Sequence, residues 1–468
     1  FFSFLLWPQA TVKASEVWEQ VGGMGLGDAD NTMVITLETL GNAIYAGIGN
    51  DTDGGRIYRS TDGNTWTKVN NDGFGHVALN AIVDFEVFGE SLFASADDDN
   101  AVPAQPGEIW KSNDGITWIQ SGNDGLGHNH NTGFYEMAEF NGQLYAGSRN
   151  ATDGGEIYRT ADGTNWNLIA ASAGGFGDAN NTIILSLKSF GGWLYAGTHN
   201  DNGAQVWRSN NGTDWNLHLD FALFNANITG VNHFFEFNNL LHWFGIDAAE
   251  GASITRKTTD ILTETFIGFT GDANNIWYSQ NAVISDGLLY GGTRNNVTGG
   301  ELWYTSDGVN LTQIGLDGFG NVDNFAIYAL TFKDYLYVGL STGNALKGCE
   351  IWRRYSSSSF GMKTKKLPDG QQNDRYGTTL ETSGGQTPYQ YTLIKGALPS
   401  GLTLDENSGE IRGTPKESGD FQFIIQVQDS SKKEQKSQSI YNLKIVAGAS
   451  DTNISELTIL PLTGANLN

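Results

Sequence analysis

The chain has 468 residues, with 61 glycines, 8 prolines and 12% aromatic residues, a mixture that favours many short strands and tight turns over disorder. Its net charge of −25 argues against nucleic acid and anionic membrane surfaces as partners, because both of these bind cationic proteins. Residues 1–360 hold 40 of the 52 acidic side chains and 16 of the 27 basic ones. This change in charge balance predicts a domain boundary near residue 360.

The chain begins with an apolar run from Phe1 to Trp7, followed by small residues up to Ala14. Such a pattern is typical of the end of a secretory signal, so residues 1–14 are predicted to be its remnant; a frayed apolar terminus is the alternative. The single cysteine, Cys349, permits no intramolecular disulfide. This suits either a cytosolic protein or a bacterial surface protein with a large core. No apolar run reaches the length of about 18 residues that a membrane-spanning helix needs.

An internal repeat is the main signal in the chain. Segments similar to Gly155-Glu-Ile-Tyr-Arg159 occur seven times at spacings of 48–52 residues. Their central aliphatic residues are Ile57, Ile109, Ile157, Val206, Ile254, Leu302 and Ile351. Each copy holds four short apolar runs, which in the third copy are 133–140, 143–147, 156–160 and 165–170. Four such strands in a repeat of about 40–50 residues predict a blade of a β-propeller.

The seventh copy ends near Arg354 and lacks its fourth strand. The N-terminal segment Val17-Trp-Glu-Gln-Val21 is similar to Thr65-Trp-Thr-Lys-Val69, which is the fourth strand of the first copy. We therefore predict that residues 16–22 complete the last blade and cover an edge that would otherwise be free to aggregate. The predicted fold class is all-β: a seven-bladed β-propeller over residues 15–357, closed by its N-terminal strand, and a further domain after it.

A turn motif such as Ser60-Thr-Asp-Gly-Asn-Thr-Trp66 lies between the third and fourth strands of five copies. In such a turn the Asp accepts hydrogen bonds from later backbone N–H groups, the Gly adopts a positive φ angle and the Trp packs between blades. The turns resemble the Asp-box of sialidase-like (BNR) propellers, although they are one residue shorter than the usual motif. The residues concerned are Asp62, Trp66, Asp114, Trp118, Asp162, Trp166, Trp215 and Asp307.

An element that recurs in five blades is expected to be structural, because a functional site normally breaks the symmetry of a repeat. For a sialidase, the resemblance implies three active-site arginines, a Tyr nucleophile and an early Phe-Arg-Ile-Pro segment. The sequence has no such segment, and it has few arginines outside the repeated third-strand position. No catalytic residue is therefore assigned.

The loops on the face opposite the Asp-boxes are predicted to carry any specific site. Asparagines recur there before the first strand of each copy, and they suit either a polar ring that holds a ligand or turns that cap their own backbone; we favour the turns. These asparagines are Asn31, Asn80, Asn131, Asn181, Asn227, Asn275 and Asn324. The positions at the ends of the second strands differ between blades, as expected of a site written on a fixed scaffold. These positions are Gly49, Asp97, Arg149, His199, Ile246, Arg294 and Ser341.

Aromatic rings on this face could stack on sugars while polar side chains bond hydroxyl groups; an acidic solvated rim is the alternative. The candidate ligand-binding residues are His128, His130, Tyr135, Arg149, Asn150, His199, Asn200, Trp277, Arg294 and Asn295. His128 and His130 are two apart, which on a strand would place them on one face. Without a Cys or a third His beside them, no zinc site is predicted. Oxygen ligands that suit Ca²⁺ are offered by Asp51, Asp53, Asp97, Asp98, Asp99 and Asp201. A Ca²⁺ site therefore stays open, although the sequence has no calcium-binding loop with a closing Glu. No metal or other cofactor is assigned.

Residues 361–447 read as a second all-β domain. The segments Leu398-Pro-Ser-Gly-Leu-Thr-Leu-Asp405 and Gly409-Glu-Ile-Arg-Gly-Thr-Pro415 are followed by the alternating run Phe421–Asp429. Short alternating strands separated by Gly and Pro over about 90 residues predict a β-sandwich. The segments strongly resemble the Ig-like (cadherin-like) domains of bacterial surface proteins, which implies a spacer or an adhesion module.

Residues 448–468 form a polar linker that contains Leu460, Pro461, Thr463 and Gly464 in the order Leu-Pro-x-Thr-Gly. This motif resembles the sorting signal cut by sortases, which implies a covalent link from Thr463 to peptidoglycan. An ordinary turn is the alternative, because Pro and Gly both favour turns. Taken together, these features predict a secreted, cell-surface recognition or adhesion protein of a bacterium that binds a glycan or a protein. A sialidase-like glycoside hydrolase or polysaccharide lyase and a structural surface-layer component are the alternatives.

Overall fold

The computed structural model describes residues 18–98, 105–223, 225–247, 251–256, 265–268, 277–278, 282–285, 287–308, 310–333, 335–343, 347–355, 361–364, 366–383, 388–430 and 436–448. The predicted signal remnant and the sorting motif lie outside these ranges. The chain divides into two compact units, Phe1–Ser356 and Ser357–Asn468. Within the described residues, no helix is both long and apolar enough to cross a membrane.

The first unit consists of consecutive four-stranded antiparallel blades. Blade 1 contains β2 (Met33–Leu40), β3 (Ala43–Gly49), β4 (Arg56–Ser60) and β5 (Thr67–Lys68). Blade 2 contains β6 (Ala81–Phe88), β7 (Ser91–Asp97), β8 (Glu108–Ser112) and β9 (Ile119–Gln120). Blade 3 contains β10 (Gly133–Phe140), β11 (Gln143–Arg149), β12 (Ile157–Thr160) and β13 (Asn167–Leu168). Blade 4 contains β14 (Ile183–Phe190), β15 (Trp193–His199), β16 (Gln205–Ser209) and β17 (Asn216–Asp220).

The remaining blades follow the same order. Blade 5 contains β18 (Ile228–Phe237), β19 (Leu240–Asp247), β20 (Gly251–Arg256) and β21 (Thr265–Gly268). In blade 6, β22 (Trp277–Tyr278) and β23 (Val283–Ser285) both pair with β24 (Leu288–Arg294) in the place of a first strand, and β25 (Leu302–Thr305) and β26 (Thr312–Ile314) follow. Blade 7 contains β27 (Asn324–Phe332), β28 (Tyr335–Thr342), β29 (Glu350–Tyr355) and, from the other end of the chain, β1 (Trp18–Val21).

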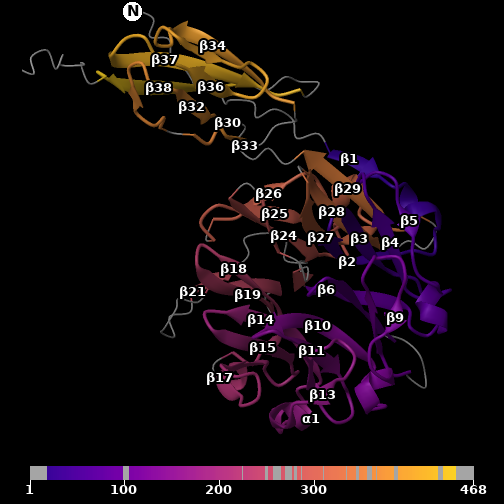
Figure 1. The fold of residues 1–468 in the computed structure, drawn as a ribbon. Coiled ribbons are helices and arrows are strands. Elements are labelled where there is room, and N and C mark those ends of the chain that lie inside the picture. Colours follow the sequence, from indigo (N-terminus) through magenta and orange to yellow (C-terminus); the bar gives the residue numbers. More distant parts are fainter. Residues whose placement is uncertain are drawn as a thin grey trace, which may run out of the picture. The chain divides into compact units, whose positions relative to one another are not determined.

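The N-terminal strand closes the ring, as predicted. β1 pairs antiparallel with β29, with Trp18 opposite Arg354 and Val21 opposite Ile351. Figure 1 shows the indigo start of the described chain beside the orange strand β29, so the two ends of the propeller meet. The innermost strands of successive blades pack against one another, and β2 also packs against β27 and β28 of blade 7. The first unit is therefore a closed seven-bladed β-propeller.

Helical turns precede most first strands. They are η1 (Met24–Gly27), η2 (Asp72–Gly75), η3 (Asp124–Gly127), η4 (Ala170–Ser172) with α1 (Ala173–Phe176), η5 (Phe221–Leu223) and η6 (Asp317–Gly320). A Gly and the following Leu or Phe adopt positive φ angles in several of them, for example Gly73 at 51° and Phe74 at 52°. The Phe74 ring then stacks on Trp110 of β8, with ring centroids 4.3 Å apart. Phe176 and Trp207 repeat this stack at 4.4 Å.

The turns between third and fourth strands are held by their Asp and Ser or Thr side chains. In blade 1, Asp62 Oδ1 accepts the backbone N–H groups of Asn64 and Thr65 at 2.8 and 2.7 Å. These bonds hold the pKa of Asp62 well below its usual range. At φ +70°, Gly63 packs so closely on Tyr337 of the preceding blade that an added Cβ would overlap the ring hydroxyl. The turns therefore join each blade to the blade before it.

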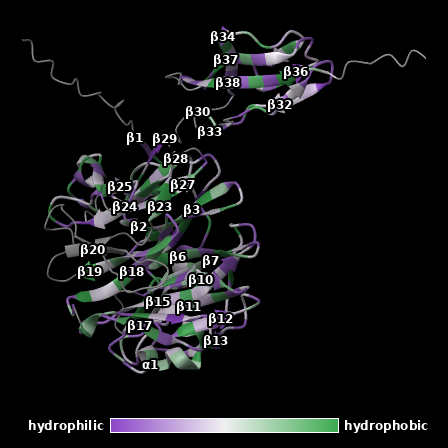
Figure 2. Cartoon of the chain, turned by 90° about the vertical axis from the view of Figure 1, so that its left-hand side faces the viewer, coloured by the Kyte–Doolittle hydropathy of each residue, from purple (hydrophilic) through white to green (hydrophobic). Residues whose placement is uncertain are grey.

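The core lies between neighbouring blades. Trp66 packs against Val21, Tyr337 and Ile351 at the junction of blades 7 and 1. Trp118, Trp166 and Trp215 take equivalent places at the next three junctions. In Figure 2 hydrophobic residues gather on the strands of the propeller, while many of its loops are hydrophilic. This distribution agrees with the alternation read from the sequence.

The second unit is a small sandwich with its own core. β31 (Gly370–Gln371), β38 (Lys436–Val446), β37 (Gly419–Gln428) and β34 (Gln390–Gly396) form one sheet. β32 (Tyr376–Thr379), β36 (Glu410–Gly413) and β35 (Leu402–Leu404) form another, and β30 (Gly361–Met362) pairs with β33 (Thr382–Ser383). Ile411 and Phe423, from different sheets, are buried in one cluster. This is the Ig-like β-sandwich that the sequence predicts.

Candidate functional site

The asparagine-rich loops on one face of the propeller are tied together by buried side chains. Asn131, before β10, donates from Nδ2 to the carbonyl oxygen of Gly125 at 3.1 Å, and Asn150, after β11, donates to Asn131 Oδ1 at 3.1 Å. Asn150 Oδ1 in turn accepts the backbone N–H groups of Thr152 and Asp153 at 3.1 and 2.8 Å. The same pairing occurs in blades 1 and 4. The loop before a first strand and the loop after the second strand therefore share this face.

These asparagines belong to the turns. Asn150 and Asn295 are fully buried and Asn200 is 2% exposed, so the amides of these three candidate residues are not presented to a ligand. Of the expected ring of seven, Asn227 is exposed and does not occupy the equivalent place. Asn80 donates to Asp51 instead of closing a turn, and Asn275 lies outside the described residues. The turn interpretation applies to Asn31, Asn131, Asn181 and Asn324, whose amides all close the preceding helical turn.

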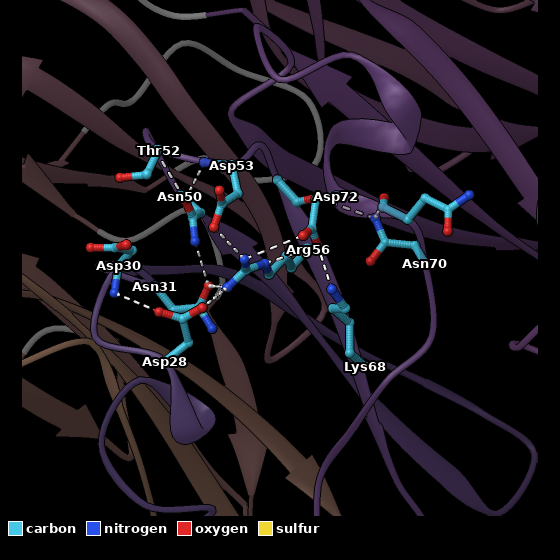
Figure 3. A network of polar contacts seen from close by, with 12 residues as sticks. Asp28, Asp30, Asn31, Asn50, Thr52, Asp53, Arg56, Lys68, Asn70 and Asp72 are labelled. Carbon is cyan, nitrogen blue, oxygen red and sulfur yellow. Dashed lines mark hydrogen bonds and ion pairs between the residues drawn. The ribbon is translucent and has the colours of Figure 1, made fainter.

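In blade 1 the loop before β2 and the loop after β3 surround the side chain of Arg56 (Figure 3). The guanidinium group of Arg56, only 5% exposed, contacts Asp28 at 2.6 Å, Asp53 at 2.7 Å and Asp72 at 3.0 Å. Its hydrogen bond holds the pKa of Asp28 below its usual range. Two of the aspartates are more than a third exposed, so water screens part of the attraction. Asp53, one of the oxygen ligands considered for Ca²⁺, is therefore paired with a guanidinium.

In blade 3 the same loop pair holds two histidines. His130 Nδ1 lies 2.5 Å from Asp153 Oδ2, and His128 Nε2 lies 3.5 Å from the same oxygen. His128 follows η3 and both residues lie in a turn, so the prediction that a strand aligns them is wrong. Their rings converge, with centroids 5.6 Å apart, because the turn folds back towards the loop after β11.

The varied positions at the ends of the second strands lie together on this face, around the centre of the ring. Each of them lies beside the start of the first, innermost strand of the following blade. Backbone pairing places Arg149 opposite Ile183, His199 opposite Gly230 and Arg294 opposite Ala326. Bulges in the first strands add side chains beside them. We call these residues the collar: Ile35, Gly49, Val83, Asp97, Tyr135, Arg149, Leu185, His199, Asn232, Ile246, Arg294, Phe325 and Ser341.

The collar carries its two guanidinium groups in blades 3 and 6. Arg149 Nη1 lies 3.6 Å from the buried Asp97 carboxylate and 3.5 Å from the Tyr135 hydroxyl. The guanidinium of Arg294 lies over the Phe325 ring, 4.7 Å from its centroid. Burial lowers the pKa of His199, and the Arg149 charge acts in the same direction, although Asp201 opposes both. The imidazole of His199 is therefore neutral at neutral pH.

Apart from Asp97, the collar is apolar over blades 1 and 2. Ile35, Ala81 and Val83 are buried together, with Met33 packed against them. Gly49, at the position that Arg149 occupies in blade 3, leaves room for Met33 and Ile35. Trp277 of β22 lies opposite Arg294 in backbone register, and its side chain lies outside the described part of the chain. The collar thus combines an apolar sector, two guanidinium groups and aromatic rings within one rim.

Deeper in the channel, acidic side chains connect neighbouring innermost strands. Asp84 Oδ2 accepts the backbone N–H of Met137 in the next blade at 2.7 Å. Burial and the nearby charges of Glu38 and Glu136 raise the pKa of Glu86 to about 8. Burial and the charges of Glu136 and Glu86 likewise raise the pKa of Asp84. With a pKa of about 8, Glu86 holds a proton at neutral pH.

Two open grooves lie at the opposite edge, between blades 1 and 2. Residues of the Asp-box turn, Asp62 and Thr65, line one of them together with Ile116. Trp110 and Trp118 line the other. The walls of both grooves are side chains that already hold turns or pack between blades. We place the candidate site at the collar because its residues differ between blades while the scaffold repeats.

Comparisons with known proteins agree with this architecture. Residues 362–446 match the family model described as "Putative Ig domain", which confirms the Ig-like part of the sequence interpretation. No curated protein matches the chain. Two structures of the extracellular domain of BT4673 from B. thetaiotaomicron, called a putative one-component system in one and a putative hybrid two-component system in the other, align with TM-scores of 0.52 at 14% identity.

These alignments cover 93% and 92% of this chain, which spans only about 60% of the length of those domains. The polysaccharide lyase Uly1 aligns with a TM-score of 0.45 at 11% identity, over 75% of this chain and 94% of the lyase. At such identities the BT4673 alignments support the fold alone, and the lyase alignment carries no argument. The Asp-box and sorting motifs are supported by sequence resemblance alone.

The sequence missed several members of the site. The sequence places Asp97 among the varied positions and the possible Ca²⁺ ligands but not among the candidate binding residues, and it points neither to Phe325 nor to Asp153 and Glu156, the partners of the two histidines. A signal for the last pair exists: His128, His130, Asp153 and Glu156 lie exactly 100 residues after Asp28, Asp30, Asp53 and Arg56.

Proposed function

We propose that this chain is an extracellular bacterial protein that recognises a glycan or a cell-surface protein without transforming it, and that the collar is its binding surface. The observation that carries the proposal is the asymmetry of the collar on a repeated scaffold. Tyr135, Arg149, His199 and Arg294 come from different blades, yet their strand positions direct them to one rim. The turns that support this rim are built alike in several blades.

The chemistry of the rim suits sugars. Tyr135 and Phe325 are half-buried rings on which a pyranose face can stack. Arg149 is 27% exposed and His199 is 29% exposed, so both remain within reach of hydroxyl or carboxylate groups. The buried Asp97 holds the Arg149 guanidinium towards Tyr135 and so orients it before any ligand binds. Such preorganisation reduces the entropic cost of binding.

The Ig-like domain and the tail are proposed to present this propeller at the cell surface. The Ig-like domain would act as a spacer, and the Leu460–Gly464 motif would supply attachment to peptidoglycan through Thr463. Together with the apolar N-terminal run, these features support a secreted and wall-attached protein. The localisation proposal is independent of which ligand the collar binds.

The proposal is tested by screening the full chain on an array of neutral, uronate-containing and sialylated oligosaccharides and bacterial polysaccharides, and on surface proteins of neighbouring cells. The triple variant Arg149→Ala, His199→Ala, Arg294→Ala should lose binding to any hit and still fold, as circular dichroism will show, although its melting temperature should fall because a cation beside the buried Asp97 carboxylate is removed. A matched control removes Lys111 and Arg159, two cations on third strands near the opposite face, and should bind normally.

Three other results of this experiment would each support a different interpretation of the protein. Loss of binding in the control but not in the collar variant would reject the collar. Release of new reducing ends or unsaturated sugars from the same glycans would favour the hydrolase or lyase. Failure to bind any probe, together with assembly of the chain into ordered sheets, would favour a structural surface-layer component.

A further inference from the structure

A second constellation on the same face lies in blade 3, outside the collar. His128 and His130 come from the turn before β10, and Asp153 comes from the loop after β11. Among the described residues, these three form the group whose imidazole nitrogen or carboxylate oxygen atoms all lie within 4.8 Å of one another. His128 is 36%, His130 52% and Asp153 43% exposed, so solvent reaches the space between them.

One imidazole of this group is oriented from behind by a buried carboxylate. His128 Nδ1 lies 3.1 Å from Oε2 of Glu156, which is nearly buried. The same oxygen accepts the Tyr158 hydroxyl at 2.7 Å and is 3.3 Å from Asn131 Nδ2, so its position is set by the fold. The Asn150 amide nitrogen also lies 3.4 Å from His128 Nδ1. With these groups on Nδ1, the other ring nitrogen, Nε2, faces Asp153 Oδ2 at 3.5 Å.

The corresponding loops of blade 1 show what this scaffold does without the histidines. Asp28, Asp30, Asp53 and Arg56 stand at the positions of His128, His130, Asp153 and Glu156. There the Arg56 guanidinium supplies the positive charge between the carboxylates. In blade 3 a carboxylate replaces the arginine and two imidazoles replace two carboxylates. Blade 3 therefore keeps two acidic groups and loses the cation that balances them in blade 1.

We propose that His128, His130 and Asp153 bind a divalent first-row transition metal ion, with Zn²⁺ as its representative, and that Glu156 is a positioning residue behind His128. Two imidazoles and one carboxylate suit such ions, whereas Ca²⁺ and Mg²⁺ prefer oxygen ligands alone. A carboxylate behind a metal-ligating histidine is the usual supporting contact. Ligand atoms around tetrahedral zinc lie roughly 3–4 Å apart. His130 Nδ1 and Asp153 Oδ2, now 2.5 Å apart, would therefore separate slightly, and no pair of the group, all within 4.8 Å, would need to close by more than about 1 Å.

Three protein ligands leave a fourth position open to water or to a ligand group. A bound ion would lie between His130 Nδ1 and Asp153 Oδ2, which are 2.5 Å apart. It would also fasten the turn before β10 to the loop after β11, which are otherwise joined here through the amides of Asn131 and Asn150. The site is independent of the collar, and it holds whether or not the collar binds a glycan.

The test is isothermal titration calorimetry of the metal-free full chain with ZnCl₂. We expect one saturable site that excess CaCl₂ does not displace, and visible ligand-field bands when Co²⁺ replaces Zn²⁺. The double variant His128→Gln, His130→Gln should lose this site and its Co²⁺ bands. Glu156→Gln should weaken the affinity by about 10–100-fold and keep the stoichiometry, as expected of a group that orients a ligand.

The matched control is Asp30→Asn, at the position of His130 in blade 1, which should bind Zn²⁺ like the wild type. A second control, His76→Gln, removes an exposed histidine that lies 3.1 Å from Glu108 in blade 2 and should also be neutral. Circular dichroism confirms that each variant is folded. The proposal is wrong if the wild-type chain shows no saturable Zn²⁺ site, or if the double histidine variant retains the wild-type affinity and stoichiometry.

Discussion

Closure of the propeller by β1 can be tested through a single side chain. Trp18 occupies in blade 7 the place that Trp66 occupies in blade 1, and it packs on the preceding blade beside Tyr290, Leu302 and Ile314. Its ring meets Phe319 edge-on with centroids 4.9 Å apart, and the Arg354 guanidinium lies 5.4 Å from the ring centre. Replacing Trp18 by Ala removes all of these contacts and leaves the backbone pairing of β1 with β29 intact.

The magnitude follows from those contacts. Complete truncation of a buried Trp costs about 3–5 kcal/mol, and the half-buried Trp18 should therefore lose roughly 2 kcal/mol. The aromatic pair and the guanidinium contact add about 1 kcal/mol together. A loss of about 3 kcal/mol should lower the melting temperature by roughly 4 °C in a domain of this size. Deleting residues 16–22 should cost more, because Val21, at 2% exposure, leaves the core as well.

The assay is differential scanning calorimetry with circular dichroism, which separates the propeller transition from that of the Ig-like domain. The control is Ile119→Ala in β9, another fourth strand, where the side chain is 56% exposed and the change should stay within about 0.5 kcal/mol. If Trp18→Ala melts like the Ile119→Ala control, the contribution of β1 to the closed ring is refuted.

Three further predictions follow from single groups. Arg56→Leu removes the cation that Asp28 and Asp53 contact, while Asp72 keeps Lys68, and should destabilise the propeller by about 2 kcal/mol at pH 7. Because the pKa of Asp28 is lowered in the folded state, this difference should shrink as the pH falls below the ordinary value of 3.8, which thermal melts across pH will show. Glu86 has a raised pKa, so the wild type should lose stability as the pH rises from 4.5 to about 8; Glu86→Gln should remove this loss, and equal melting curves at pH 8 would contradict it. Thr463→Ala should release the protein from the wall fraction into the medium, measured by immunoblotting; unchanged retention would reject sortase attachment.

The sequence contains most of the information on the fold because the repeat is redundant. Seven copies of one strand pattern define the blades, and the similarity of 17–21 to 65–69 identifies the closing strand without any tertiary information. The sequence holds a second regularity, which links the residue in a helical turn to the aromatic residue in the third strand of the blade that follows. The helical turn carries Phe where the third strand has Trp, as in Phe74 with Trp110 and Phe176 with Trp207. It carries Leu where the third strand has Tyr, as in Leu126 with Tyr158.

The candidate site could be predicted only in part. The ends of the second strands were identifiable, because their residues vary at a fixed place in the repeat. Which of the neighbouring residues are buried could not be predicted. Asn150 follows Arg149 directly, yet the amide of Asn150 is enclosed by two turns while the Arg149 side chain reaches the rim. Neighbouring residues in a loop point in directions that its turn geometry sets, and residue type alone does not reveal which of them is buried.

The sequence by itself determined the strands, the number of blades and their closure, since these depend on alternation and on the period of the repeat. Only the tertiary structure decided which loop residues meet. His128 and Asp153 are 25 residues apart and become neighbours because two strands and a loop return the chain to the same face. Whether Asp97 meets Arg149, or Arg294 meets Phe325, depends on how one blade packs on the next. Such contacts depend on the angle and spacing between blades, which the packing of the whole ring determines.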